Sequence, residues 1–249
     1  MTALAATPVA RRSATAHTVH RLGATLLRLG RWFWAIAVLV VAAANVVGWA
    51  TTGSTDVSIA VYARQASTWF PFSLAIMVVA AYLRVHVASG MTRRTFVRAA
   101  LLVQVAAGVG FALALTALVL LERAVHDALG WGSRITEVQI ADETSPVGVL
   151  LLDLAVPFVM ANVAGLLVGV VYLRGGAWWG TLTLPLTVGP LVVALYAPGA
   201  RLLEAPGLGT DLTEGQYLAL SVGLCLLVTA VSAAVFAALA LRTPLTGKA

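Results

Sequence analysis

Long apolar runs separated by short polar segments dominate the chain between residues 32 and 241. Six runs have about the length of 20 residues that a helix needs to cross a bilayer; they are residues 32–50, 69–87, 99–121, 146–173, 177–197 and 216–241. Trp32 and Trp49 lie at the two ends of the first run, as in the aromatic belts of membrane proteins. The pattern predicts an all-α, polytopic membrane protein whose six transmembrane helices form one domain, residues 32–241.

The segments that flank this domain differ from one another. Residues 1–17 are small, polar and basic, and residues 242–249 are short and polar, so both are predicted to be tails. In residues 18–31, leucines at helical spacing alternate with Arg and His. This pattern favours a short amphipathic helix that lies in the membrane interface before the first span. A solvated basic flank is the alternative.

Charged residues are too few for an ordinary soluble domain. They make up 10% of the 249 residues, and 60% are hydrophobic, whereas soluble proteins have about 25% charged residues. Basic residues outnumber acidic ones by 16 to 10. In a membrane protein we assign this excess to lipid headgroups and topology, and expect no nucleic-acid partner. The single cysteine, Cys225, can form no disulfide within the chain.

The distribution of charge predicts which segments face the cytoplasm. Residues 1–31, 84–98, 174 and 242–249 include basic residues and no acid, and the segments on the other side contain every acid except Asp153. The positive-inside rule therefore places both termini and the segment between the second and third spans in the cytoplasm. On the opposite side, the acidic residues 122–145 are predicted to form a hydrated loop, with a short amphipathic turn around residues 123–129.

The segment between the second and third spans, residues 89–98, reads SGMTRRTFVR. Gly90 is a helix breaker, and Thr92 is suited to cap the N-terminus of the helix that follows. The segment is too polar and too basic to lie in lipid. Two interpretations remain open: a positively charged anchor that only fixes topology, and an elbow between two helices that another protein grips.

Common catalytic signatures are missing from the sequence. It has no GxxxxGK[ST] loop to hold nucleotide phosphates, no HExxH metal motif and no GxSxG nucleophile elbow. Aspartates and glutamates do not pair within a span, so a membrane metal site has no support. We therefore expect no catalytic residue, metal or cofactor in this chain.

One ionisable side chain, Asp153, lies inside a predicted span. A carboxylate at that depth costs several kcal/mol unless it faces a partner or water. Pro157, four residues later, cannot donate to the carbonyl of Asp153, so the helix is expected to be weakened there. The acid either lines a pathway or gate, or is neutralised by protonation or by neighbouring helices.

Other polar or helix-breaking residues within spans are also candidates. Pro185 and Pro190 imply a kink or break in the fifth span, which can mark a moving or substrate-lining helix. Asn45, Gln104 and Asn162 are isolated amides, and each is expected to form a hydrogen bond between helices. Gly165 and Gly169 form a GxxxG pattern, which permits either close packing of helices or dimerisation.

With six spans, a basic N-terminal helix and this elbow, the chain resembles the small permeases of ABC-2-type bacterial transporters. The equivalent loop in that family often reads Gly-x-[Ser/Thr]-Arg-Arg-x-Phe, and the residues of this chain that match it are Gly90, Thr92, Arg93, Arg94 and Phe96. The specific motif covers about eight residues, and the architecture covers most of the chain. Two departures are a longer, more acidic loop after the third span and a Gly/Pro-rich segment before the sixth.

The resemblance implies the membrane subunit of an ATP-driven exporter in the bacterial cell membrane. A separate cytosolic ATPase would bind ATP and Mg²⁺ and dock on the elbow. Phe96 and Met91 would then insert into its groove, while Arg93 and Arg94 pair with its acids. A second copy of the permease, or a homologous permease, would complete the pathway. The rivals are a non-transporting scaffold or accessory subunit, a membrane enzyme acting on lipid, and an ion-coupled secondary carrier that uses Asp153.

Overall fold

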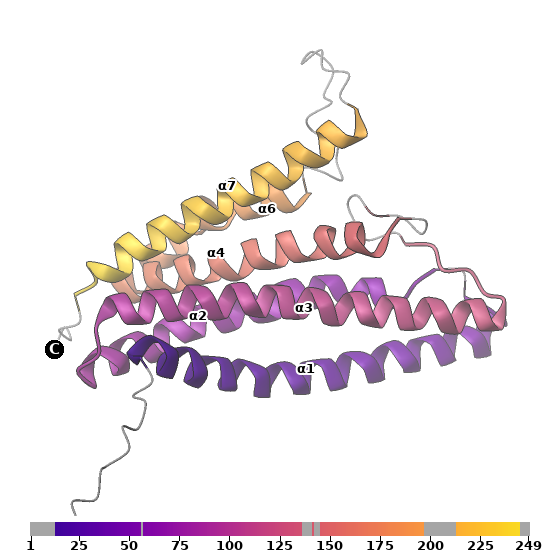
Figure 1. Cartoon of the computed structure of the whole chain (residues 1–249), viewed down its shortest axis with the longest axis horizontal. Helices are drawn as coiled ribbons and strands as arrows, with labels where there is room; N and C mark the ends of the chain where they lie inside the picture. Colours follow the sequence, from indigo (N-terminus) through magenta and orange to yellow (C-terminus); the bar gives the residue numbers. More distant parts are fainter. Residues whose placement is uncertain (1–12, 56, 136–140, 142–144, 197–212, 245–249) are drawn as a thin grey trace, which may run out of the picture.

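The computed structural model describes residues 13–55, 57–135, 141, 145–196 and 213–244 as a bundle of helices (Figure 1). The helices are α1 (Ala14–Thr52), η1 (Ala60–Tyr62), α2 (Ala63–Ala88), α3 (Arg93–Leu129), α4 (Val147–Leu182), α5 (Leu184–Thr187), α6 (Gly189–Tyr196) and α7 (Glu214–Leu241). The described residues contain no β-strand. Five helices, α1 to α4 and α7, are long and apolar enough to cross a membrane. The all-α class is thus confirmed, and the long apolar helices are those expected of a transmembrane protein.

The helices run back and forth between two ends of the bundle (Figure 1). One end holds the start of α1, the turn between α2 and α3, and the end of α7, and we call it the elbow end. The opposite end holds the end of α1, η1, the end of α3 and the start of α4, and we call it the distal end. The basic segments that the sequence singles out therefore meet at the elbow end.

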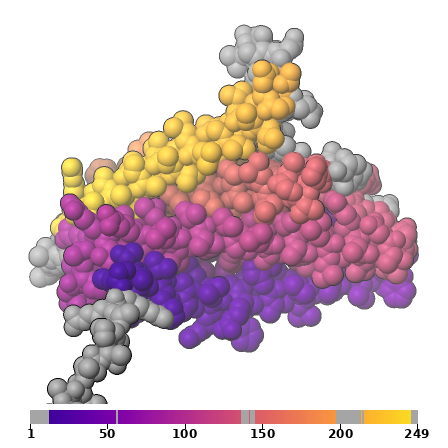
Figure 2. Space-filling model, viewed as in Figure 1, coloured from indigo at the N-terminus to yellow at the C-terminus, as the bar shows by residue number. Residues whose placement is uncertain are grey.

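Helix α4 occupies the centre and packs against α2, α3 and α7, while α1 and α7 form opposite edges (Figure 2). Its closest neighbour is α2. A Cβ atom added at Gly165 would lie 2.5 Å from the carbonyl oxygen of Phe72, and one added at Gly169 would lie 2.9 Å from that of Ile76. The GxxxG pattern therefore serves packing within the chain, because only glycine lets the two backbones approach this closely.

Helix α1 continues without a break from Ala14 to Thr52. At 1.5 Å per residue it is about 58 Å long, well beyond the roughly 30 Å of a hydrocarbon core. The separate interfacial helix predicted for residues 18–31 is not confirmed, because Leu22 and Leu26 are buried against the bundle. Residues 14–17, predicted as part of the N-terminal tail, are helical, while residues 1–12 lie outside the described part of the chain.

The predicted fifth span, residues 177–197, is divided into short pieces. Gly176 has a φ of 72°, which kinks α4 at the predicted turn, and the helix is interrupted again at residues 183 and 188. Pro185 and Pro190 lie in the first turns of α5 and α6, where a missing N–H does no harm. The predicted break is confirmed, but a sixth continuous span is not. The pieces still bring the chain back along α7, so that α7 ends at the elbow end (Figure 1).

Candidate functional site

The turn that begins α3 has the geometry that the sequence predicts. Gly90 has a φ of 82°, a left-handed conformation that favours glycine. Thr92 caps the helix, because its hydroxyl accepts a hydrogen bond of 3.2 Å from the N–H of Thr95. The elbow is therefore a tight reversal between α2 and α3, with Gly90, Thr92 and Arg94 exposed at its surface.

Phe96 does not lie where the resemblance implies. Its side chain is fully buried, in a cluster that includes Leu22 of α1, Leu83 of α2 and Phe236 of α7. Its ring also packs at 5.5 Å, centroid to centroid, from the ring of His86. The expectation that Phe96 inserts into a partner's groove is therefore corrected: this side chain anchors the elbow to three helices of its own chain. Met91 is half-buried beneath the turn.

The arginines of the elbow end differ in what they contact. Arg93 donates from Nη1 to the carbonyl oxygen of Leu241 at 2.8 Å, and Arg174 donates from Nη1 to that of Leu239 at 3.0 Å. Both therefore satisfy carbonyls at the C-terminus of α7, where the helix dipole favours cations. Arg94 and Arg98 are exposed, and among the described residues they do not bond the carbonyls of α7. Of the two arginines expected to meet a partner's acids, only Arg94 is fully available.

Asp153 is buried in the bundle, at 5% exposure. Its Oδ2 atom accepts a hydrogen bond of 3.4 Å from the N–H of Ala141. Arg64 of α2 is also buried, at 5% exposure. Helix α4 passes through Pro157 with helical geometry, so the expected weakening produces no break there.

The isolated amides make two of the three expected interhelical bonds through their side chains. Asn45 bonds α3, as described below, and Asn162 donates from Nδ2 to the backbone carbonyl of Gln104 at 3.2 Å. The side-chain amide of Gln104 is fully buried, and neither its nitrogen nor its oxygen has a partner among the described residues. The prediction for Gln104 is therefore wrong in detail, because its bond to α4 uses the main chain.

A buried acid at the distal end, Glu122, was not among the sequence candidates. Its carboxylate accepts from the Asn45 amide at 2.7 Å, from the Ser58 hydroxyl, and from the N–H groups of Ile59 and Ala60 at 3.1 Å. The side chain is 6% exposed. This one carboxylate thus joins α1, η1 and α3, and its donors offset the cost of burying a charge.

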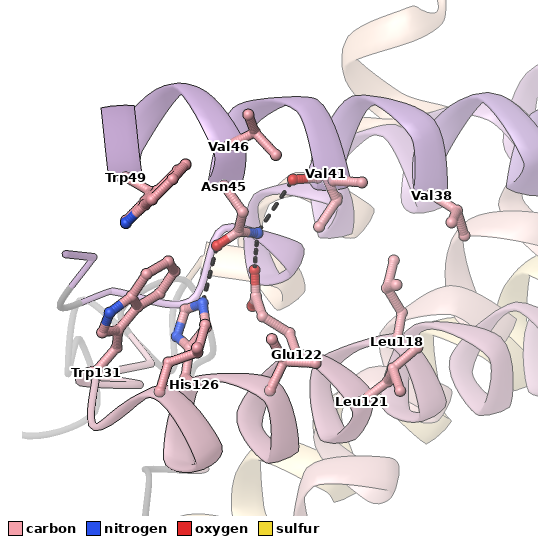
Figure 3. A pocket seen from close by; sticks show the side chains of 13 residues that line it. Val38, Val41, Asn45, Val46, Trp49, Leu118, Leu121, Glu122, His126 and Trp131 are labelled. Atoms are coloured by element: carbon pink, nitrogen blue, oxygen red, sulfur yellow. Dashed lines mark hydrogen bonds between the residues drawn. The ribbon is translucent and has the colours of Figure 1, made fainter. Parts of the chain in front are cut away.

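His126 extends the same cluster by one turn of α3 (Figure 3). The Asn45 amide donates to Glu122 and to the carbonyl of Val41 at 3.1 Å, so its oxygen faces His126 Nε2 at 2.8 Å. His126 Nδ1 faces the carbonyl oxygen of Gly132 at 2.8 Å. The Thr55 hydroxyl lies 3.3 Å from the same Nε2 atom. Both ring nitrogens therefore have polar partners, and Asn45 links the His126 ring to the Glu122 carboxylate.

An apolar groove of about 490 Å³ lies between α1 and α3, and this cluster forms part of its lining (Figure 3). Apart from the polar cluster, its walls are aliphatic and aromatic, and Trp49 and Trp131 lie at its distal end. Residues 122–129 were predicted to begin a hydrated loop. In the structure they continue α3. The spacing of Glu122 and His126, one helical turn apart, was the available clue.

Comparisons with protein-family models, curated protein sequences and solved structures gave no match to this chain.

Proposed function

We propose that this chain is the membrane-spanning permease subunit of an ATP-driven exporter of the ABC-2 type. A separate cytosolic ATPase would dock on the elbow, residues 89–98, and a second permease would complete the pathway. The proposal rests on the elbow motif and on one observation: the elbow is attached to α1, α2 and α7 through Phe96, and to α7 again through Arg93.

This attachment suits an elbow that transmits force. A partner that displaces the turn moves Phe96, and the residues packed around it must move as well, because close-packed cores transmit strain. The exposed Arg94 and Arg98 supply positive charge for acids on the ATPase. Arg93 serves a different purpose, since it carries the displacement to α7. In this mechanism the chain binds neither ATP nor Mg²⁺ itself.

Co-purification of the full chain from its native membrane tests this proposal. The informative variant is Arg94→Gln/Arg98→Gln, because both side chains are exposed and their loss leaves the packing around Phe96 intact. The matched control is Arg28→Gln/Arg31→Gln, which removes the same charge from exposed positions of α1. We expect a nucleotide-binding subunit to accompany the wild type and the control and to be lost from the elbow variant. Its absence from the wild type would contradict the proposal.

Asp153 supports an ion-coupled carrier as the second candidate, because an acid buried within a span is typical of proton and ion relays. Under that mechanism Asp153→Asn abolishes transport, and transport follows a proton or sodium gradient. Under the exporter mechanism transport follows ATP, and the same variant leaves ATPase binding unchanged. A scaffold would show neither dependence.

A further inference from the structure

The apolar groove between α1 and α3 at the distal end has no part in the proposed transport mechanism. Along α1 it extends from Val38 to Trp49, about 16 Å at 1.5 Å per residue. Both residues belong to the apolar run 32–50. The hydrocarbon core of a bilayer is about 30 Å thick, so that one leaflet contributes about 15 Å. The groove therefore has the length of the acyl layer of a single leaflet.

The walls of the groove favour an apolar occupant. Aliphatic side chains of α1 and α3 form most of the lining. Asn45, Glu122 and His126 also belong to it, but their amide, carboxylate and ring nitrogens already have partners within the chain. A polar occupant would give up its hydrogen bonds to water and find no unsatisfied donor on these three residues, which costs free energy. A hydrocarbon chain has no such cost.

Two tryptophans at the distal end of the groove supply its free donors. Trp49 of α1 is 57% exposed, and Trp131, which follows α3, is partly exposed. Their indole N–H groups make no hydrogen bond within the described part of the chain. Figure 3 shows both indole nitrogens on the side away from Val38 and Leu118. The groove is thus apolar along its length and ends in two donors, the arrangement by which tryptophans meet the membrane interface.

The polar cluster of Asn45, Glu122 and His126 holds one of these donors in place. Gly130 ends α3 with a φ of 69°, and the backbone N–H of Trp131 then donates to the carbonyl oxygen of His126 at 2.8 Å. The Trp131 ring packs on the His126 ring at a centroid distance of 5.4 Å. Because His126 is bonded to Asn45 of α1, one set of contacts fixes both walls and the distal end. The site is therefore preformed, as ligand pockets usually are.

We propose that this groove binds one acyl chain of a phospholipid from the leaflet at the distal end, and that the Trp49 and Trp131 indoles donate to its ester oxygens. The described residues that line the groove include no Lys or Arg, so the site does not select an anionic headgroup. It uses only this chain and the bilayer. Lipid binding here is therefore independent of whether an ATPase docks on the elbow.

Photocrosslinking of the delipidated full-length protein in detergent tests the site. The probe is a phosphatidylcholine with a diazirine at the middle of one acyl chain, used in equimolar amount. We expect the label on the two walls, residues 38–49 and 118–129. Ala42→Phe should remove most of it, because Ala42 lines the groove and the larger ring would occupy it. Ala43→Phe is the matched control: Ala43 is also exposed on α1 but lies outside the groove, so its variant should be labelled like the wild type.

A second variant tests the two donors. Trp49→Phe/Trp131→Phe keeps the aromatic rings and removes both N–H groups. We expect it to weaken phosphatidylcholine binding about tenfold in native mass spectrometry, the loss expected for two hydrogen bonds of modest net strength. Phosphatidylglycerol should compete for the wild-type groove as well as unlabelled phosphatidylcholine does, because no cation lines it.

Several results would overturn the proposal. Label spread evenly over the lipid-facing helices, or equal label in Ala42→Phe and the wild type, would show that no lipid occupies the groove. Unchanged binding by the double tryptophan variant, or displacement by hexadecane as effective as by phosphatidylcholine, would show that the indoles recognise no oxygen. If Ala42→Phe converts a dimer into a monomer in light scattering and Ala43→Phe does not, the occupant is a second copy of this chain.

Discussion

The two ends of the bundle differ in whether their polar side chains have hydrogen-bond partners. At the distal end, Glu122 is buried and surrounded by donors from α1 and η1, and both ring nitrogens of His126 have polar partners. At the elbow end, arginines are numerous, two of them hold carbonyls of α7, and His86 keeps an unpaired nitrogen. A matched network stabilises one arrangement, whereas the elbow end keeps exposed cations such as Arg94. The two ends therefore differ in how completely their polar side chains are paired.

The largest expected effect is at the matched end. Glu122→Ala removes the acceptor of Asn45, Ser58 and two backbone N–H groups at once. Loss of one member of a buried charged network costs about 3–5 kcal/mol, and thermal unfolding in detergent should show it as a large fall in melting temperature. Asp127→Asn, an exposed acid on the same helix, should change stability by about 0.5 kcal/mol or less. Equal effects of the two variants would remove the contrast between the ends.

An intermediate effect is expected from the packed middle that joins the ends. Gly165→Ala places a Cβ 2.5 Å from the carbonyl oxygen of Phe72, a main-chain atom that cannot move aside alone. Overpacking of this kind costs about 1–3 kcal/mol. Hydrogen exchange should then rise at both ends of α4, while Gly148→Ala, which meets open space, should leave exchange unchanged. A rise confined to one end would mean that the ends are not mechanically joined through α4.

The smallest expected effect is at the elbow end. Arg93→Gln removes one charged donor from the C-terminus of α7, a contribution of about 0.3–1 kcal/mol. Hydrogen exchange of the amides in the last turn of α7 should increase severalfold, with little change in global melting temperature. Arg94→Gln, whose side chain is exposed next to it, should leave that exchange as it is. If both variants change this exchange equally, the hydrogen bond from Arg93 to Leu241 does not stabilise the end of α7.

Sequence reasoning was accurate where local chemistry decides the structure. Gly90 and Thr92 form a turn and a cap because these residue types favour such conformations regardless of their surroundings. Pro185 and Pro190 interrupt the helix because they lack an N–H and restrict the preceding backbone. Even so, local signals did not decide whether the interrupted segment counts as a span.

Prediction from sequence fails where contacts between distant segments decide the structure. The family resemblance implies that Phe96 inserts into a partner's groove, but Phe96 is buried in one cluster with Leu22 of α1 and Phe236 of α7. Glu122 was assigned to a loop because acids end an apolar run, yet its donors come from Asn45 and residues 58–60, more than 60 positions earlier. The pattern of hydrophobic and polar residues around Phe96 and Glu122 does not indicate either set of distant partners.

The length of α3 couples the two ends of the bundle mechanically. Phe96 and Glu122 are on the same continuous helix, about 39 Å apart at 1.5 Å per residue. A hydrogen bond keeps its strength over only about 0.5 Å of stretch, which at that distance corresponds to a rotation of about 1°. The bonds of Glu122 therefore give α3 a narrow angular tolerance. Any larger pivot at the elbow must break them or carry α1 and η1 along.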